Sequence, residues 1–422
     1  MRKLSCYLPT RLDLLNVSQD ILYWSFISIL IGIIVGFGVS YALLTMENTI
    51  EHFNYPLFLF LPFVLPIVSF VTYKSFKEAV GDGTEEIVRS AIYEDKKLRF
   101  TTFIIKQLAT FTTLLFGGSV GKEAPAAQIG AYFASFLAKL FHIDAKKRII
   151  FIITGTSAGF AVVFGAPISA GFFALEALFA GKILYRVLVP SLISSFVAYW
   201  CMHFVGVEYI YHPIYLKFVP NFWELVNVTK AVLAGVIFGF VGYGVIVTMR
   251  LANELAKRST PHPLLKGFIG GIVLVTLAMI FGEHLLGLGL QTIDLAFDPD
   301  FKLPWYDPLL KDLFTFFTIA SGGSGGFVTP ILYIGSTVGH IFAQFMNTDI
   351  KLYTALGFVS VLSGATNAPI AATILAAELF GIEVAHFAAI TATVSYLVSS
   401  QRSVFAPEIL ETIEEKFKRH IT

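Results

Sequence analysis

Long apolar segments alternate with short polar ones along almost the whole chain of 422 residues. A helix needs about 20 apolar residues to cross the hydrocarbon core of a bilayer. The charge-free runs that approach or exceed this length are Ile21 to Met46, Phe53 to Tyr73, Ile149 to Leu175, Val187 to Val207, Ala231 to Met249, Leu313 to Thr348, Leu352 to Ala377 and Val384 to Gln401. The pattern predicts an all-α polytopic membrane protein surrounded by a lipid bilayer.

The composition agrees with a membrane protein, because 56% of the residues are hydrophobic and only 14% are charged. The net charge of +1 offers no basic face for phosphates, so a nucleic-acid partner is not expected. Two cysteines, Cys6 and Cys201, are too few and too far apart for a disulfide framework. The first apolar run is too long for a cleaved signal. Basic residues near both ends and at Lys146 to Arg148 predict cytoplasmic termini in the cell inner or plasma membrane.

An internal repeat is visible in two glycine-rich frames. Gly117 to Pro125 is GGSVGKEAP, and Gly322 to Pro330, 205 residues later, is GGSGGFVTP. The frame G-x-G-x-x-x-I also occurs twice, at Gly81 to Ile87 and at Gly287 to Ile293. Three landmarks in the same order indicate a duplication, the third being an Ala-Pro-Ile with a Glu nine residues after its Pro, at Pro167 and Glu176 and again at Pro369 and Glu378.

The duplication predicts one membrane domain made of two halves, with the substrate site where the halves meet. The expected first half covers residues 18–207 and the second covers residues 222–402. Residues 208–221 form the connecting loop, in which Tyr209 is expected as an interfacial aromatic anchor. A cytoplasmic segment is expected at 1–17, and a short tail at 403–422 can form a surface helix but not a soluble regulatory domain.

The two glycine-rich frames favour an anion site. Glycine and proline break helices, and an irregular backbone at membrane depth is tolerated only where it is covered or lines a cavity. New helices are expected from Lys122 and Phe327 onward, with Pro125 and Pro330 in their first turns. Helix starts present free N–H groups and the positive end of the helix dipole, which attract anions. Glu123 can mimic the anion and act as a gate; a structural Lys-Glu pair capping the helix is the alternative.

These motifs resemble those of the CLC family of chloride channels and proton/chloride exchangers. GKEAP at 121–125 resembles the family's G-(K/R)-E-G-P, GGFVTP at 325–330 resembles its G-x-F-x-P region, and GDGTEEI at 81–87 takes the place of G-S-G-I-P-E. The resemblance covers nearly the whole chain and implies an inverted repeat of about 18 membrane-embedded helices in a homodimer. It implies Glu123 as the gating residue and anion binding by Gly121, Lys122, Ala124, Gly326, Phe327, Val328, Asp82, Gly83 and Phe405.

Four departures from the family pattern bear on mechanism. Ala124 replaces a glycine, and Asp82 stands where the family has an anion-coordinating serine. Phe405 replaces an anion-contacting tyrosine and lacks its hydroxyl. Ala177 stands where proton-coupled members have an acidic residue, with Glu176 next to it as a possible proton-pathway residue. The expected function is transport of chloride-class anions by a glutamate-gated channel or a weakly coupled transporter; the alternative is a proton-coupled chloride or fluoride antiporter.

A remote alternative is an intramembrane serine hydrolase. Both GGS frames satisfy G-x-S-x-G, so Ser119 or Ser324 could be a nucleophile with a histidine as base. The duplication argues against it, because one active site needs one nucleophile. The histidine spacing indicates no metal site, and His340 is expected as a satisfied core residue. We therefore expect a protein that is not an enzyme, has no cofactor, and carries a halide as its transported ligand. Glu176 and Glu378 also fit a structural role at helix ends.

Overall fold

The computed structural model describes residues 11–52, 56–75, 86–87, 89–90, 98–178, 185–209, 213–214, 225–258, 262–399 and 403–405. Within these residues the fold is all-helical, with 15 α-helices and no strand, which confirms the predicted class. The helices differ greatly in length, from α11 with 6 residues to α1 with 42. Short helices with broken ends bring irregular backbone into the interior of the molecule, where the site described below lies.

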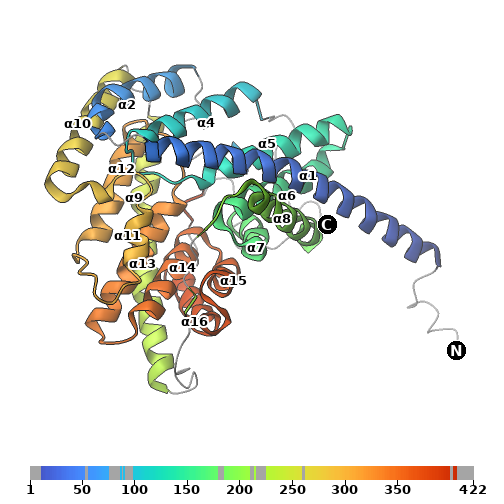
Figure 1. Cartoon of the computed structure of the whole chain (residues 1–422). Helices are drawn as coiled ribbons and strands as arrows, with labels where there is room; N and C mark the ends of the chain where they lie inside the picture. The colour runs from blue at the N-terminus through green and yellow to red at the C-terminus, as the bar shows by residue number, and fades with distance from the viewer. Residues whose placement is uncertain are drawn as a thin grey trace.

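The first half of the chain contributes the blue to green helices of Figure 1. They are α1 (Arg11–His52), α2 (Leu61–Phe70), α4 (Phe100–Leu115), α5 (Glu123–Leu140), α6 (Ala145–Phe164), α7 (Pro167–Leu178) and α8 (Tyr185–Val205). The second half contributes α9 (Leu225–Lys257), α10 (Pro263–Phe281), α11 (Leu290–Leu295), α12 (Asp307–Ala320), α13 (Val328–Phe345), α14 (Ile350–Thr366), α15 (Pro369–Phe380) and α16 (Ile382–Val398).

Five helices of the described part are long and apolar enough to cross a membrane. They comprise residues 21–50 of α1, residues 147–164 of α6, and the whole of α8, α9 and α10. Large apolar side chains lie exposed on them, among them Phe26, Trp200, Phe204 and Phe240. Such a surface suits lipid rather than water. The chain is an integral, multi-pass membrane protein.

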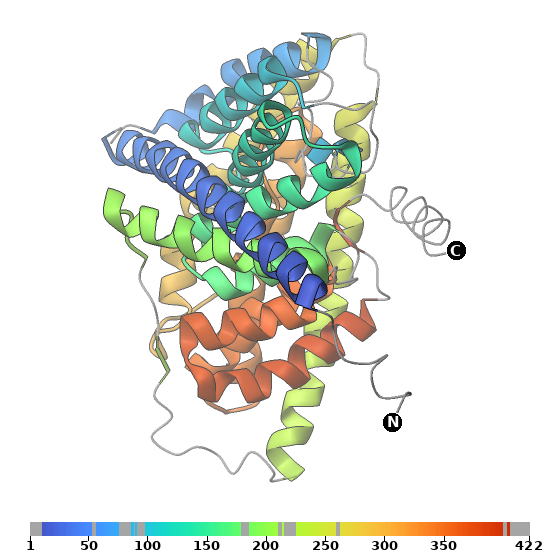
Figure 2. The ribbon, with the colours of Figure 1, turned by 90° about the vertical axis from the view of Figure 1, so that its right-hand side faces the viewer.

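The two halves pack into each other and do not form separate bodies. Green α7 lies beside red α15 in Figure 1, and α2 packs on α10. Within each half the same pairs recur: α5 packs along α6 as α13 does along α14, and α1 packs along α8 as α9 does along α16. In Figure 2, α1 crosses the front of the molecule diagonally, and the long α9 runs along most of its height. The fold thus carries the duplication that the sequence predicts.

Glycine pairs explain how closely the repeated helices approach. A Cβ at Gly130 of α5 would collide with the carbonyl of Gly155 in α6, and the reverse is also true. Gly335 of α13 and Gly357 of α14 stand in the same relation. Small residues allow helix backbones in membranes to meet directly, which replaces the hydrophobic drive that lipid does not supply. The starts of α5 and α13 are therefore held against a rigid support.

Candidate functional site

The two glycine-rich loops meet at the centre of the fold. α5 begins at Glu123 and α13 at Val328, with Lys122 and Phe327 as their N-cap residues. Pro125 and Pro330 lie in the first turns, as predicted. The loop glycines pair as a two-residue antiparallel bridge, in which Gly121 N–H donates to Gly326 O at 2.7 Å and Gly326 N–H donates to Gly121 O at 2.8 Å. Two helix N-termini are thereby fixed side by side.

Hydroxyl groups tie each loop to the helix that precedes the other loop. Ser119 Oγ lies 3.0 Å from Thr315 Oγ1, and Ser324 Oγ lies 3.1 Å from Thr110 Oγ1. The N–H groups of the same serines donate to threonine hydroxyls in the same crossed way, to Thr318 from Ser119 at 3.1 Å and to Thr113 from Ser324 at 3.2 Å. Reciprocal contacts of this kind are the mark of a two-fold relation. Both serines face threonines, which is not the nucleophile–base geometry of a hydrolase.

The carboxylate of Glu123 is directed at the start of α13. The residue is 3% exposed. One carboxylate oxygen accepts a hydrogen bond from Thr329 N–H at 3.2 Å, and the other accepts one from the Thr329 hydroxyl. Thr329 is the second residue of α13, so its N–H is one of the donors that the helix itself leaves free. A Cβ at Gly121 would overlap this carboxylate, which gives a reason for glycine there. The side chain thus occupies a place suited to an anion.

The ammonium of Lys122 is paired with α1. It lies 2.7 Å from a carboxylate oxygen of Glu47 and sits 5.2 Å from the ring centre of Tyr209. The Tyr209 hydroxyl donates to Val162 O at 2.8 Å. Tyr209 is half-buried and lines the cavity described below. A cation over an aromatic ring and against a carboxylate is well stabilised, so Lys122 helps to shape this wall.

A cavity of about 490 Å³ opens in front of these groups. Glu123, Lys122 and Thr329 lie on its wall, together with three more carboxylates, Glu47, Glu208 and Asp294. Most of the remaining lining is apolar: Ile50, Val163, Phe164, Leu288, Leu290, Ile293, Phe297, Leu332, Phe358, Leu375, Leu379 and Phe380. Residues from both halves contribute, so the cavity lies between the repeats. A mostly apolar cavity with a small number of polar groups on its wall is the usual form of a small-ligand site.

Comparison with known proteins assigns the family. Residues 63–400 match the sequence profile of the family described as voltage gated chloride channel. The chain belongs to the CLC family. A chloride/fluoride channel protein of Pseudomonas syringae pv. tomato is 31% identical over 411 residues, which are 94% of this chain and 88% of that protein.

Solved CLC structures share the fold. A CLC-type fluoride/proton antiporter is 30% identical, with a TM-score of 0.84 over 92% of this chain and 97% of that one. A slow cyanobacterial Cl⁻/H⁺ antiporter is 19% identical, with a TM-score of 0.76 over 89% of this chain and 94% of that chain. The second likeness concerns the fold alone. The CLC architecture expected from the sequence motifs is thus confirmed.

The other expected anion-site residues divide into three groups. Ala124, Phe327 and Val328 are buried at the two helix starts, beside the Gly121–Gly326 bridge. Phe405 is buried away from the cavity wall, where its N–H donates to Ser403 Oγ at 3.1 Å. Asp82 and Gly83 lie outside the described residues. The helix starts are therefore the part of the expected site that the structure brings together.

Glu176 and Glu378 make a second crossed contact between the repeats. Glu176 of α7 accepts hydrogen bonds from the N–H groups of Ile370 and Ala371, at 3.3 and 2.8 Å, at the start of α15. Glu378 of α15 accepts from Ile168 and Ser169 at the start of α7, at 2.9 and 2.7 Å. Each carboxylate caps the helix of the other repeat. This is the helix-end role that the symmetry of the two glutamates suggested. His340 is fully buried and both of its ring nitrogens have partners, as expected: Nδ1 lies 2.7 Å from Ala296 O, and Nε2 lies 2.8 Å from Gln344 Nε2.

Two features of the CLC site were missed in the sequence. Thr329, the partner of Glu123, lies inside the quoted GGFVTP frame but carries no charge to attract notice. The second feature is the segment before each GGS, K-x-L-x-T-F-x-T, at residues 106–113 and again at 311–318. This longer repeat supplies all four threonines of the crossed network. Extending the repeat toward the N-terminus from each GGS frame would have found them.

Proposed function

We propose that this CLC protein moves a small halide across the membrane in exchange for protons, with Glu123 as both gate and proton carrier. The observation that supports the proposal is the contact of the Glu123 carboxylate with the N–H and hydroxyl of Thr329. The carboxylate and a halide need the same donors at the start of α13. They therefore compete for one place.

Competition of this kind couples the two ions. An ionised Glu123 fills the anion place and closes the pathway. A protonated Glu123 is neutral, holds the donors more weakly, and yields to a halide. A side chain that alternates between the two forms carries a proton each time an anion takes its place. Binding at helix N-termini without a full positive charge also lets the ion leave again.

Fluoride is the favoured substrate over chloride. The likeness at 30% identity to a fluoride/proton antiporter and the likeness to a chloride/fluoride channel protein both support this choice. Fluoride is the smallest halide and the strongest hydrogen-bond acceptor, so a compact pair of N–H and O–H donors suits it.

Purified protein in liposomes tests the proposal. With fluoride inside, we expect fluoride efflux, measured with an ion-selective electrode, to drive proton uptake reported by a pH dye trapped in the lumen. Glu123→Gln should abolish fluoride-driven proton uptake, because an amide cannot exchange a proton at neutral pH. Its remaining anion flux should no longer change with pH. Glu254→Gln, an exposed glutamate near the end of α9, is the matched control and should behave as wild type.

Two results would contradict this function. Wild-type liposomes that pass neither fluoride nor chloride at any pH would exclude the anion pathway. Proton uptake that persists in Glu123→Gln would exclude Glu123 as the carrier.

A passive anion channel is the second candidate. The observation that favours it is Ala177, which stands where coupled relatives are expected to hold an acidic residue. Its neighbour Glu176 is engaged in capping α15 and cannot bind a proton without weakening that cap. Anion flux without any proton movement against a gradient would favour the channel. The liposome assay with the lumenal pH dye therefore distinguishes a passive channel from a proton-coupled antiporter.

A further inference from the structure

Two buried lysines occupy equivalent positions in the repeats. Lys106 of α4 and Lys311 of α12 lie 205 positions apart, each 11 residues before the first glycine of a GGS frame. Both are 0% exposed. A charged side chain inside the membrane part of a protein is expensive and needs strong partners. The presence of a buried lysine at the equivalent position of both repeats indicates that it has a structural or functional role.

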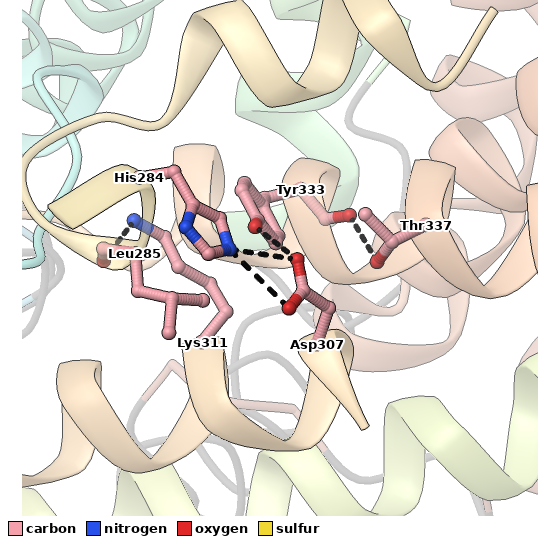
Figure 3. Close-up of polar contacts among 6 residues, drawn as sticks. All are labelled: His284, Leu285, Asp307, Lys311, Tyr333 and Thr337. Atoms are coloured by element: carbon pink, nitrogen blue, oxygen red, sulfur yellow. Dashed lines mark hydrogen bonds and ion pairs between the residues drawn. The ribbon is translucent and has the colours of Figure 1, made fainter. Parts of the chain in front are cut away.

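Lys311 forms hydrogen bonds with the backbone segment that precedes α11. Its ammonium donates to Leu285 O at 3.0 Å and to Gly287 O at 2.8 Å. It also sits 5.0 Å from the ring centre of Tyr333. Figure 3 shows the lysine reaching from α12 toward Leu285, with Tyr333 nearby. The ammonium is thus in contact with two carbonyls and an aromatic face, which offset part of the cost of its burial.

A second anchor holds the start of the same segment. Asp307, the first residue of α12, is 1% exposed and accepts a hydrogen bond from the Tyr333 hydroxyl at 3.1 Å. Nε2 of His284 lies 3.1 Å from the same carboxylate oxygen, and Figure 3 shows the imidazole directed at it. His284 immediately precedes Leu285, the first carbonyl that Lys311 holds. The segment is therefore fastened to α12 at two successive points.

The fastened segment forms part of the transport cavity. Leu288 and Leu290 line the cavity wall. Gly287 N–H donates to Gly117 O at 3.1 Å, which links the segment to the loop leading into Glu123. Gly289 has a positive φ of 73°, and a Cβ built there would lie 3.2 Å from the ammonium of Lys311. The lysine thus stands directly behind the wall that faces Glu123 and Thr329.

We propose that Lys311 is a positioning residue for anion transport: it fixes the backbone of residues 285–289 so that this wall of the cavity has the shape the anion needs. The proposal rests on the proposed function. Lys311 then affects transport through the backbone of residues 285–289, without contacting the transported ion. A displaced wall weakens anion binding but leaves the gate Glu123 and its partner Thr329 in place.

The test measures anion flux against anion concentration in liposomes, with fluoride and then chloride. Lys311→Met keeps the length of the side chain and removes its donors; it should raise the half-saturating concentration about fivefold and leave the maximal rate within about twofold. Lys311→Arg keeps charge and donors and should recover most of the affinity. Lys266→Met is the control, because Lys266 of α10 also donates to two carbonyls, Leu255 O and Ala256 O, but lies away from the cavity.

A second variant tests the wall without touching the lysine. Gly287 has a φ of 56°, and a Cβ there meets no atom within 4 Å, so Gly287→Ala strains the backbone without a clash. Gly287→Ala should also raise the half-saturating anion concentration. The double variant should show less than the summed effect, because both changes act on one element.

The outcomes separate this inference from the proposed function. Wild-type protein without anion flux refutes the function itself. Wild-type flux with an unchanged half-saturating concentration in Lys311→Met refutes only the positioning role. Strict additivity with Gly287→Ala also refutes it, since the lysine would then act independently of the segment. If Lys311→Met does not yield folded protein, an unchanged half-saturating concentration in Gly287→Ala overturns the proposal.

Discussion

At the scale of single residues, the proposed gate predicts that the hydroxyl of Thr329 stabilises the closed position of Glu123. Thr329→Val keeps the shape and the backbone N–H but removes the O–H that donates to Glu123. A hydrogen bond to a charged group contributes about 1.5–3 kcal/mol, so the ionised carboxylate should yield more readily to a halide. We expect halide flux at alkaline pH to rise about tenfold, with fewer protons moved per anion. Flux electrodes and the lumenal pH dye measure both quantities.

The conservative change is the control for this residue. Thr329→Ser keeps the hydroxyl and should stay close to wild type in flux and coupling. A valine variant that transports with the wild-type pH dependence would show that the backbone N–H of Thr329 alone holds the gate. The contact could not be predicted from the sequence, because nothing near Thr329 in the chain shows which group its hydroxyl bonds at the start of the helix. Only the close approach of two helix starts directs it at Glu123.

At the scale of helices, we expect the crossed caps of α7 and α15 to contribute to stability. Glu176→Gln leaves a weaker acceptor for two N–H groups and should lower the free energy of unfolding by about 1–3 kcal/mol. Glu378→Gln should lower it less, because Glu378 is half-buried whereas Glu176 is 2% exposed. Thermal unfolding in detergent measures both. A proton-pathway role for Glu176 predicts a different result: proton flux would fall in Glu176→Gln while stability stayed unchanged.

Helix boundaries near the site could be predicted, but helix partners could not. The positions of glycine and proline predicted the starts of α5 and α13, because those residues restrict the backbone locally. The Glu47–Lys122 ion pair joins residues 75 positions apart, and the Glu176 cap joins residues 195 positions apart. Nothing local distinguishes these glutamates from others in the chain. The first helix also begins at Arg11, inside the segment expected to precede the first half.

At the scale of the whole molecule, the repeat is built so that each half completes the other. The crossed Ser–Thr contacts, the Gly121–Gly326 bridge and the crossed glutamate caps all run between halves. Duplication could be predicted from three short motifs. The reciprocity could not, because equal spacing fits both separate repeats and interlocked ones. The interlocked arrangement is known only from the structure, in which α7 packs against α15 and the two glycine-rich loops pair with each other.

The interlocking of the two halves predicts how each half behaves when it is produced alone. Residues 1–207 and 208–422, produced alone, each leave buried serines, glycine N–H groups and helix starts without their partners, and a buried group without a partner costs about 1–3 kcal/mol. Neither half should yield a monodisperse, cooperatively unfolding species in detergent. Produced together from two genes, they should assemble, co-purify and restore fluoride flux, because the break falls in the connecting loop and cuts none of the crossed contacts. A half that folds alone with a sharp unfolding transition would show that the contacts between the repeats serve transport and contribute little to stability.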